Sequence, residues 1–184
     1  MKLARHIPAD RNRPHVLDKR VDYATLFMNY AVVRDCVFVD ECGYNIWAAR
    51  SQGRALQGEK AYRHVCRQRG RNLTATMALS PINGLVSSAA FVGGMNAERF
   101  DKFLTQARTN LDPGESLIFV YDGAPAHWNP IVPAPNTDLK MLPPYSSFLN
   151  IVEQAISCLK AAIKADNSRP EIQRRMDDRD EARV

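Results

Sequence analysis

Leu117-Ile-Phe-Val-Tyr-Asp122-Gly-Ala-Pro-Ala-His127 is an apolar run that stops at a carboxylate. Its first five residues are rich in β-branched and aromatic side chains, which predicts a buried strand, and Gly-Ala-Pro then turns the chain out of it. Asp122 is therefore expected at the carboxyl end of a strand, where α/β sheets usually place their chemistry. Cys36-Val-Phe-Val-Asp40-Glu41-Cys42-Gly43 has the same pattern. Two strand-end aspartates indicate one shared site.

Upstream of the central strand, the sequence predicts a hairpin and a helix. Leu73–Leu79 and Leu85–Val92 are β-prone runs, and the Asn83-Gly84 pair between them is a strong turn signal. Asn96 is expected to cap a helix that reaches Thr109, because apolar residues recur along one face of this segment.

Earlier elements are predicted from weaker signals. Ile7–Lys19 carries two prolines and many charges, which indicates an extended lead-in, and Val21–Val33 has helical spacing. After the first strand, Tyr44–Ala48 and Arg54–Leu56 suggest a short hairpin turned through Ser51-Gln52-Gly53.

Downstream of His127, prolines predict a connector with at most one turn of helix. Asp138–Leu142 is a short candidate strand, and a helix is expected from about Phe148 to Ala165 with Glu153 in its second turn. The charged stretch from Asp166 to Val184 is expected to fray.

Composition bounds the class of protein. The chain has 184 residues, of which 45% are hydrophobic and 24% charged, which is typical of one globular domain and excludes wholesale disorder. Its apolar runs are far shorter than the roughly 20 residues that span a bilayer, and no signal-peptide core follows the N-terminus, so we expect an intracellular, unsecreted protein. Four cysteines without a C-x-x-C pair predict reduced thiols rather than a zinc site.

Positive charge is concentrated between Arg50 and Arg71. The formal net charge of the chain is +5. Seven cations stand in this segment against the single acid Glu59, and they are Arg50, Arg54, Lys60, Arg63, Arg67, Arg69 and Arg71. Interleaved glutamines and an aromatic residue suit a nucleic-acid backbone, while a solvated basic face without a partner is the alternative.

With these elements in order, the sequence resembles the DDE transposases of the mariner superfamily, which include Tc/mariner and related bacterial insertion-sequence enzymes. The likeness is carried by Val39-Asp40-Glu41, by Tyr121-Asp122-Gly-Ala-Pro-Ala-His127, and most specifically by Leu142-Pro-Pro-Tyr-Ser-Ser-Phe-Leu-Asn-Ile-Val-Glu153. It covers roughly Val33 to Ala165. The resemblance implies an α/β, ribonuclease-H-like fold: a mixed five-stranded sheet with an antiparallel hairpin portion, flanked by helices.

The resemblance also implies the chemistry. Asp40, Asp122 and Glu153 would be catalytic acids that jointly hold two Mg²⁺ ions, for which Mn²⁺ would substitute, and the reaction would be DNA strand cleavage and strand transfer. Hard divalent cations prefer oxygen ligands, and three acids without a positive partner would otherwise repel one another. The implied partners are transposon ends and target DNA, and the resemblance is compatible with a homodimer. It implies neither a membrane partner nor a small-molecule cofactor.

Several assignments stay open at this point. Glu41 could replace Asp40 as the ligand, Asp122 could be an ordinary turn aspartate, and His127 could approach the metals or bond to a backbone carbonyl. Serine and isoleucine stand at positions 147 and 151, where the family usually has proline. An inactive transposase remnant that only binds DNA, and another ribonuclease-H-like nuclease, are the alternative functions.

The expected organisation is a lead-in segment and helix at 1–34, the DDE catalytic domain at 35–165 and a charged tail at 166–184. No helix-turn-helix pair is recognisable, so DNA binding is expected to be non-specific. The expected location is the nucleus in a eukaryote and the cytoplasm in a bacterium.

Overall fold

A computed structural model describes residues 8–30, 34–45, 55–60, 62, 72–167, 169 and 171–172. The chain forms two compact units, one of Met1–Glu41, Thr76–Ala89 and Met95–Glu153, the other of Cys42–Ala75, Ala90–Gly94 and Gln154–Val184. The core cluster and the candidate site described below lie in the first unit.

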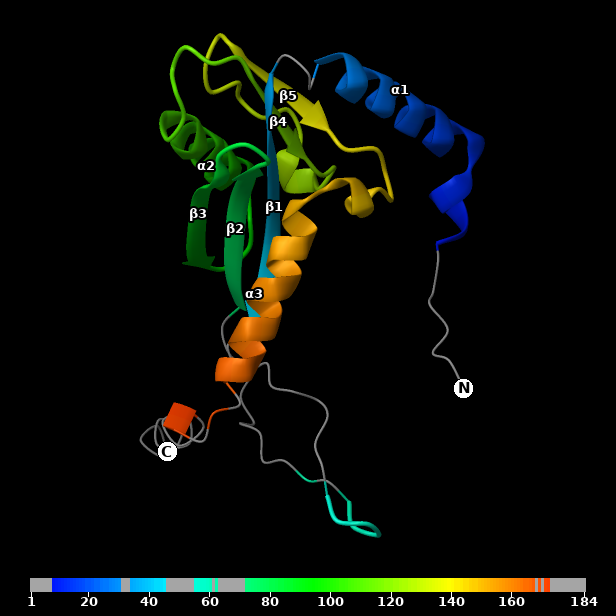
Figure 1. Cartoon of the computed structure of the whole chain (residues 1–184), viewed down its shortest axis with the longest axis vertical. Coiled ribbons are helices and arrows are strands. Elements are labelled where there is room, and N and C mark those ends of the chain that lie inside the picture. The colour runs from blue at the N-terminus through cyan, green and yellow to red at the C-terminus, as the bar shows by residue number, and fades with distance from the viewer. Residues whose placement is uncertain are drawn as a thin grey trace. The chain divides into compact units, whose positions relative to one another are not determined.

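Five strands form one sheet in the order β3-β2-β1-β4-β5 (Figure 1). Their bounds are Asp35–Asn45 for β1, Asn72–Ser80 for β2, Gly84–Val92 for β3, Leu117–Tyr121 for β4 and Thr137–Met141 for β5. β1, β4 and β5 are parallel, with Phe38 opposite Val120 and Tyr121 opposite Met141. The five-stranded sheet and the fully buried central strand β4 confirm the sequence prediction.

Helical segments precede β1, connect β3 to β4 and β4 to β5, and follow β5. They are η1 (Ala9–Asn12), α1 (Pro14–Tyr30), α2 (Ala97–Thr109), η2 (Pro125–His127), η3 (Ser147–Leu149) and α3 (Val152–Asp166). The predicted cap of α2 is confirmed, because the Asn96 side chain accepts a hydrogen bond from the Arg99 amide.

The hydrophobic core lies between α2 and one face of the sheet. Side chains two apart along a strand share a face, so Val37 and Val39 of β1 join Leu117, Phe119 and Tyr121 of β4 there. The α2 side chains of this cluster are Phe100, Phe103, Leu104 and Ala107. Phe38, which points to the other face, meets Phe27 of α1 with 6.0 Å between ring centroids.

The turn between β2 and β3 shows why the hairpin prediction succeeded. The Ser80 hydroxyl accepts hydrogen bonds from the amides of Ile82 and Asn83, and Gly84 adopts a φ of 69°. Left-handed backbone is least costly at glycine, which makes Asn83-Gly84 a reliable signal.

The prediction of an extended lead-in over Ile7–Lys19 was wrong. Residues 9–12 form η1, and α1 begins at Pro14 rather than at Val21. Proline is compatible with the first helical position because the N–H that it lacks has no intrahelical partner there. The end of the predicted helix at Val33 lies outside the described residues.

Two further boundaries differ from the sequence prediction. β1 does not stop at Asp40 but continues to Asn45, so Asp40 lies within a strand, two residues past the last pair with β4. The last helix begins at Val152 rather than Phe148, because the Asn150 side chain accepts a hydrogen bond from the Val152 amide and Ser147–Leu149 forms a separate short helix. Glu153 therefore stands in the first turn of α3, not the second.

Other predictions receive smaller adjustments. The strand expected at Asp138–Leu142 runs from Thr137 to Met141. The short hairpin expected between Tyr44 and Leu56 lies largely outside the described residues, as does most of the charged tail. Cys36 and Cys158 are free thiols. In the part of the chain that the structure describes, no helix is both long enough and apolar enough to cross a membrane.

Candidate active site

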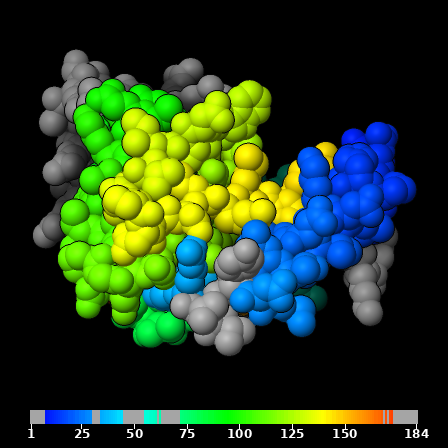
Figure 2. Space-filling view, turned by 90° about the horizontal axis from the view of Figure 1, so that it is seen from above, coloured from blue at the N-terminus to red at the C-terminus, as the bar shows by residue number. Residues whose placement is uncertain are grey.

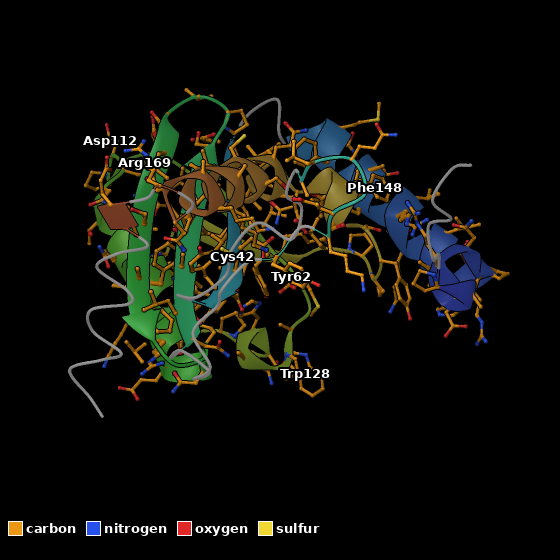
Figure 3. The ribbon with its side chains drawn as sticks, turned by 90° about the horizontal axis from the view of Figure 1, so that it is seen from below. Cys42, Tyr62, Asp112, Trp128, Phe148 and Arg169 are labelled. Carbon is orange, nitrogen blue, oxygen red and sulfur yellow. The ribbon has the colours of Figure 1, made fainter. Side chains whose placement is uncertain are left out.

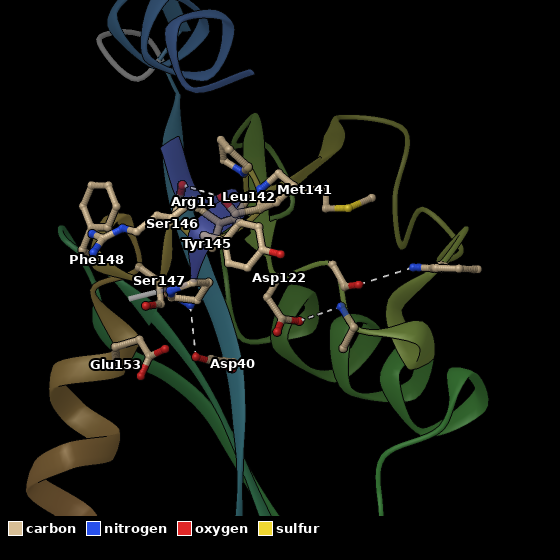
Figure 4. A pocket seen from close by; sticks show the side chains of 17 residues that line it. Arg11, Asp40, Asp122, Met141, Leu142, Tyr145, Ser146, Ser147, Phe148 and Glu153 are labelled. Carbon is tan, nitrogen blue, oxygen red and sulfur yellow. Dashed lines mark hydrogen bonds between the residues drawn. The ribbon is translucent and has the colours of Figure 1, made fainter. Parts of the chain in front are cut away.

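The three acids line one pocket of about 930 Å³ (Figure 4). Asp40 comes from β1, Asp122 directly follows β4, and Glu153 lies in the first turn of α3. The loop between β5 and α3 supplies most of the remaining wall, and η1 adds Pro8 and Arg11. Segments that are far apart in sequence thus bring together the three residues that the sequence singled out.

Asp40 is held on both carboxylate oxygens. Oδ1 accepts a hydrogen bond of 2.8 Å from the Glu41 amide, and Oδ2 accepts one of 3.3 Å from the Asn150 side chain. Burial raises the pKa of Asp40 to about 7; the Glu41 amide opposes this rise, and the nearby charges of Glu153, Asp122 and Glu41 add to it. Asp40 is therefore close enough to three other carboxylates to be repelled by them.

Asp122 is oriented by its own loop. Its Oδ1 lies 2.6 Å from Nδ1 of His127 and accepts a hydrogen bond of 3.2 Å from the Ala124 amide. The hydrogen bond from His127 lowers the pKa of Asp122, against the opposing effect of burial. A Cβ on Gly123 would lie 3.1 Å from the sulfur of the exposed Met141 side chain, which would have to shift slightly to admit a larger residue. With Oδ1 engaged, Oδ2 is the oxygen left for the pocket.

His127 is buried, with 1% of its surface exposed, and contacts two acids. Its Nε2 lies 3.1 Å from Oε2 of Glu41, without hydrogen-bond alignment, while its ring stacks on Phe100 at 4.0 Å between centroids. Burial alone would lower the pKa of His127, but the contacts with Asp122 and Glu41 raise it to about 10. Of the two roles left open for His127, the structure places the ring against Asp122, both its carboxylate and, at 3.2 Å, its backbone carbonyl.

Glu41 and Asp40 point to opposite faces of β1, because side chains alternate along a strand. Glu41 shares the face of Val37 and Val39 and reaches His127, whereas Asp40 lines the pocket. The geometry therefore favours Asp40 over Glu41 as the residue that a substrate or ion in the pocket would meet.

Among the described residues, no three His, Cys, Asp or Glu side chains converge closely enough to form a ready-made metal cluster. The donor set nevertheless suits a hard divalent cation, since Asp40, Asp122 and Glu153 offer carboxylate oxygens to one pocket. Oδ2 of Asp122 and both oxygens of Glu153 receive no hydrogen bond within the described part of the chain.

The predicted DNA-binding cations cannot be placed together. Lys60 is exposed, and Arg50, Arg54, Arg63, Arg67, Arg69 and Arg71 lie outside the described residues. Sequence reasoning missed two arginines of the N-terminal segment that meet the pocket region. Arg20 of α1 donates hydrogen bonds to the Ser146 hydroxyl and to the carbonyl of Tyr145, and Arg11 lines the pocket itself. In Figure 2, α1 in blue borders the yellow segment that contains these loop residues.

Aromatic side chains surround the pocket. Trp128, Tyr145 and Phe148 line it with 64%, 47% and 61% of their surfaces exposed. Trp128 projects from the edge of the fold in Figure 3, and its indole N–H lies 3.4 Å from the Gly123 carbonyl. Tyr145 has a left-handed φ of 57°, which costs energy in a residue with a side chain.

Comparison with known proteins gives one family match. A family model described as DDE superfamily endonuclease matches residues 35–176. No curated protein sequence matches the chain.

Solved structures resemble the fold at low identity. A pre-cleavage Mos1 transpososome has a TM-score of 0.69 at 15% identity, covering 97% of this chain and 58% of that chain. The Mos1 mariner paired end complex with Mn has a TM-score of 0.68 at 17% identity, with coverage of 97% and 58%. The catalytic domain of Mos1 mariner transposase has a TM-score of 0.59 at 13% identity, with coverage of 96% and 84%. These likenesses confirm the ribonuclease-H-like fold, and the chain spans a little over half of the longer Mos1 chains.

Proposed function

The chain belongs to the family of DDE superfamily endonucleases, and on that premise we propose that it is a transposase catalytic domain that cleaves DNA strands and transfers them to a new site. The observation that carries the proposal is the pocket in which Asp40, Asp122 and Glu153 meet from β1, the end of β4 and the start of α3. Each acid stands on a regular element or directly after one, which holds it in place.

We propose Mg²⁺, with Mn²⁺ as a substitute, as the cofactor that these three acids hold. Mos1 structures are described with Mn and with Mg, and the carboxylate donor set of this chain fits the same class of ion. When bound, such ions activate an attacking oxygen and stabilise the leaving oxygen of a phosphodiester. Binding of the ions would also stabilise the charged form of Asp40, which burial and then the neighbouring acids disfavour.

The other residues of the site would orient the acids. Asn150 and the Glu41 amide hold Asp40, while His127 and the Ala124 amide hold one oxygen of Asp122 and leave the other free. Glu153 is carried by the first turn of α3, whose start is set by Asn150. Asn150 thus contacts Asp40 and the helix that carries Glu153, which couples two of the three acids.

DNA is the proposed substrate, and the proposal extends to paired transposon ends and a homodimer. Mos1 is described in paired end complexes and in a strand transfer complex, and this chain shares the fold of those proteins. Phosphate contacts position a protein without reading the base sequence, so a sequence-specific complex would also require contacts to the bases.

The proposal predicts metal-dependent nicking of supercoiled DNA that fails in Asp122→Asn. Loss of one ligand removes several kcal/mol of transition-state stabilisation, so the rate should fall by about a thousandfold. Glu115→Gln, an exposed acid away from the pocket, should leave nicking unchanged. Joining of a DNA 3′-hydroxyl to a target strand distinguishes a transposase from a hydrolytic nuclease. Equal nicking by the parent and Asp122→Asn would reject the catalytic assignment and favour an inactive DNA-binding remnant.

A further inference from the structure

Arg11 lies in the N-terminal segment yet forms part of the acid pocket. It belongs to η1, and its guanidinium sits 5.5 Å from the ring centroid of Phe148. Figure 4 shows Arg11 and Phe148 in the upper part of the pocket, with Glu153 and Asp122 below them. Arg11 thus lines the same pocket as the three carboxylates, and within the described residues it forms no ion pair with any of them.

The neighbouring arginines form ion pairs or hydrogen bonds within the protein. Arg13 pairs with Asp10 at 2.6 Å. Arg20 donates from Nε to the Ser146 hydroxyl and from its terminal nitrogens to Asn12, Tyr145 and the Arg11 carbonyl. Within the part of the chain that the structure describes, the Arg11 side chain has neither a hydrogen bond nor an ion pair. Its guanidinium donors remain available to a ligand.

A hydrogen bond to its carbonyl and one aromatic ring restrain Arg11. Arg20 donates a hydrogen bond of 3.0 Å to the Arg11 carbonyl, and Arg20 itself lies 5.6 Å from the centroid of the same Phe148 ring. Arg11 therefore starts from a restrained position, so less side-chain entropy is lost when it binds a ligand. A planar guanidinium with free donors matches the geometry of a phosphate.

We propose that Arg11 binds a backbone phosphate of the DNA strand that enters the acid pocket. This inference rests on the proposed function and adds to it a substrate-binding residue from outside the predicted catalytic segment 35–165. The carboxylates would hold the ions that act on the reacting phosphate, and Arg11 would bind a neighbouring phosphate of the same strand. The competing reading is that Arg11 only packs on Phe148.

The test compares Arg11→Ala with Arg13→Ala, since both remove one positive charge from the same segment. Binding of a fluorescein-labelled DNA duplex is measured by anisotropy over a range of KCl concentrations in Ca²⁺, with the DNA checked for cleavage on a gel. Arg11→Ala should weaken binding about tenfold and reduce the slope of log affinity against log salt by about one, because one phosphate contact is lost. Arg13→Ala should leave the slope unchanged.

A third variant separates binding from packing. Arg11→Lys retains the charge and should restore most of the salt slope, while its thermal stability reports any loss of packing on Phe148. Equal effects of Arg11→Ala and Arg13→Ala, or a parent that does not bind the duplex, would overturn the inference. A changed salt slope without any DNA cleavage by the parent would keep the phosphate contact and reject the catalytic proposal instead.

Discussion

Asp40→Asn is expected to gain stability relative to the parent as the pH rises from 5 to 8 without metal, and to lose metal-dependent DNA cleavage. Both effects have one cause. The Asp40 carboxylate is partly buried and faces other acids, so its negative charge is unfavourable until a cation enters the pocket. Asparagine has nearly the same shape without the charge.

The direction of the pH dependence follows from the pKa. The pKa of Asp40 is about 7 in the folded protein and 3.8 in its unperturbed form. Between these values the folded state holds a proton that the unfolded state has released, so the stability contributed by this group is present at low pH and is lost as the pH rises through 7. After a several-fold discount for solvent screening, we expect about 1 kcal/mol, or roughly 2–4 °C in Tm.

Thermal unfolding in EDTA at a series of pH values measures this effect. The difference in Tm between Asp40→Asn and the parent should grow from pH 5 to pH 8. Because only the change of this difference with pH is read, any pH-independent cost of weakening the Asn150 contact drops out. Glu115→Gln should show a flat difference. If the Asp40→Asn difference is also flat, neither burial nor the neighbouring carboxylates raise the pKa of Asp40 in solution. Cleavage should meanwhile fall about a thousandfold, since a ligand worth several kcal/mol is lost.

His127 variants should separate orientation of Asp122 from simple packing. In His127→Asn the side-chain amide nitrogen falls near the original Nδ1 and can still donate to Asp122. In His127→Gln the nitrogen falls near Nε2, on the side of Glu41. Both variants lose the stacking on Phe100. Residues that hydrogen-bond to a metal ligand typically contribute 10- to 100-fold to metal affinity. His127→Gln should therefore weaken Mn²⁺ binding by about that factor, and His127→Asn should weaken it much less.

Calorimetric titration with Mn²⁺ compares the two variants directly, and the Tm in EDTA serves as the packing control. Equal Mn²⁺ affinities in His127→Asn and His127→Gln would mean that the histidine only fills space in the core. A larger loss in the asparagine variant would assign the main role to the contact with Glu41.

Strong local signals made the sheet and α2 predictable from sequence. The apolar run of β4, the Asn83-Gly84 turn and the Asn96 cap each depend on a few neighbouring residues, and each was found where expected. Two helix starts were misplaced because a proline or a side-chain cap decided them. Pro14 suggested an interruption but opens α1, and Asn150 delays the start of α3 to Val152.

The candidate site was predictable only in part, for a physical reason. The three acids follow or lie on sheet and helix elements whose order is legible in the sequence. His127 and Glu41 meet only because η2 packs against Phe100. Arg11 reaches the pocket because α1 contacts the loop before α3. Local sequence patterns do not encode such contacts. The one available signal for His127 was its place five residues after Asp122 in the same motif.

The central claim is that Asp40, Asp122 and Glu153 form a working metal site, and thermal unfolding with and without Mn²⁺ or Mg²⁺ tests it most directly. A ligand that binds only the folded state at about ten times its dissociation constant stabilises by about 1.4 kcal/mol, which is a rise of roughly 3–6 °C in Tm. The parent and Glu115→Gln should show this rise, and Asp122→Asn should not. No metal-dependent rise in the parent at saturating concentration, or an equal rise in Asp122→Asn, would contradict the account.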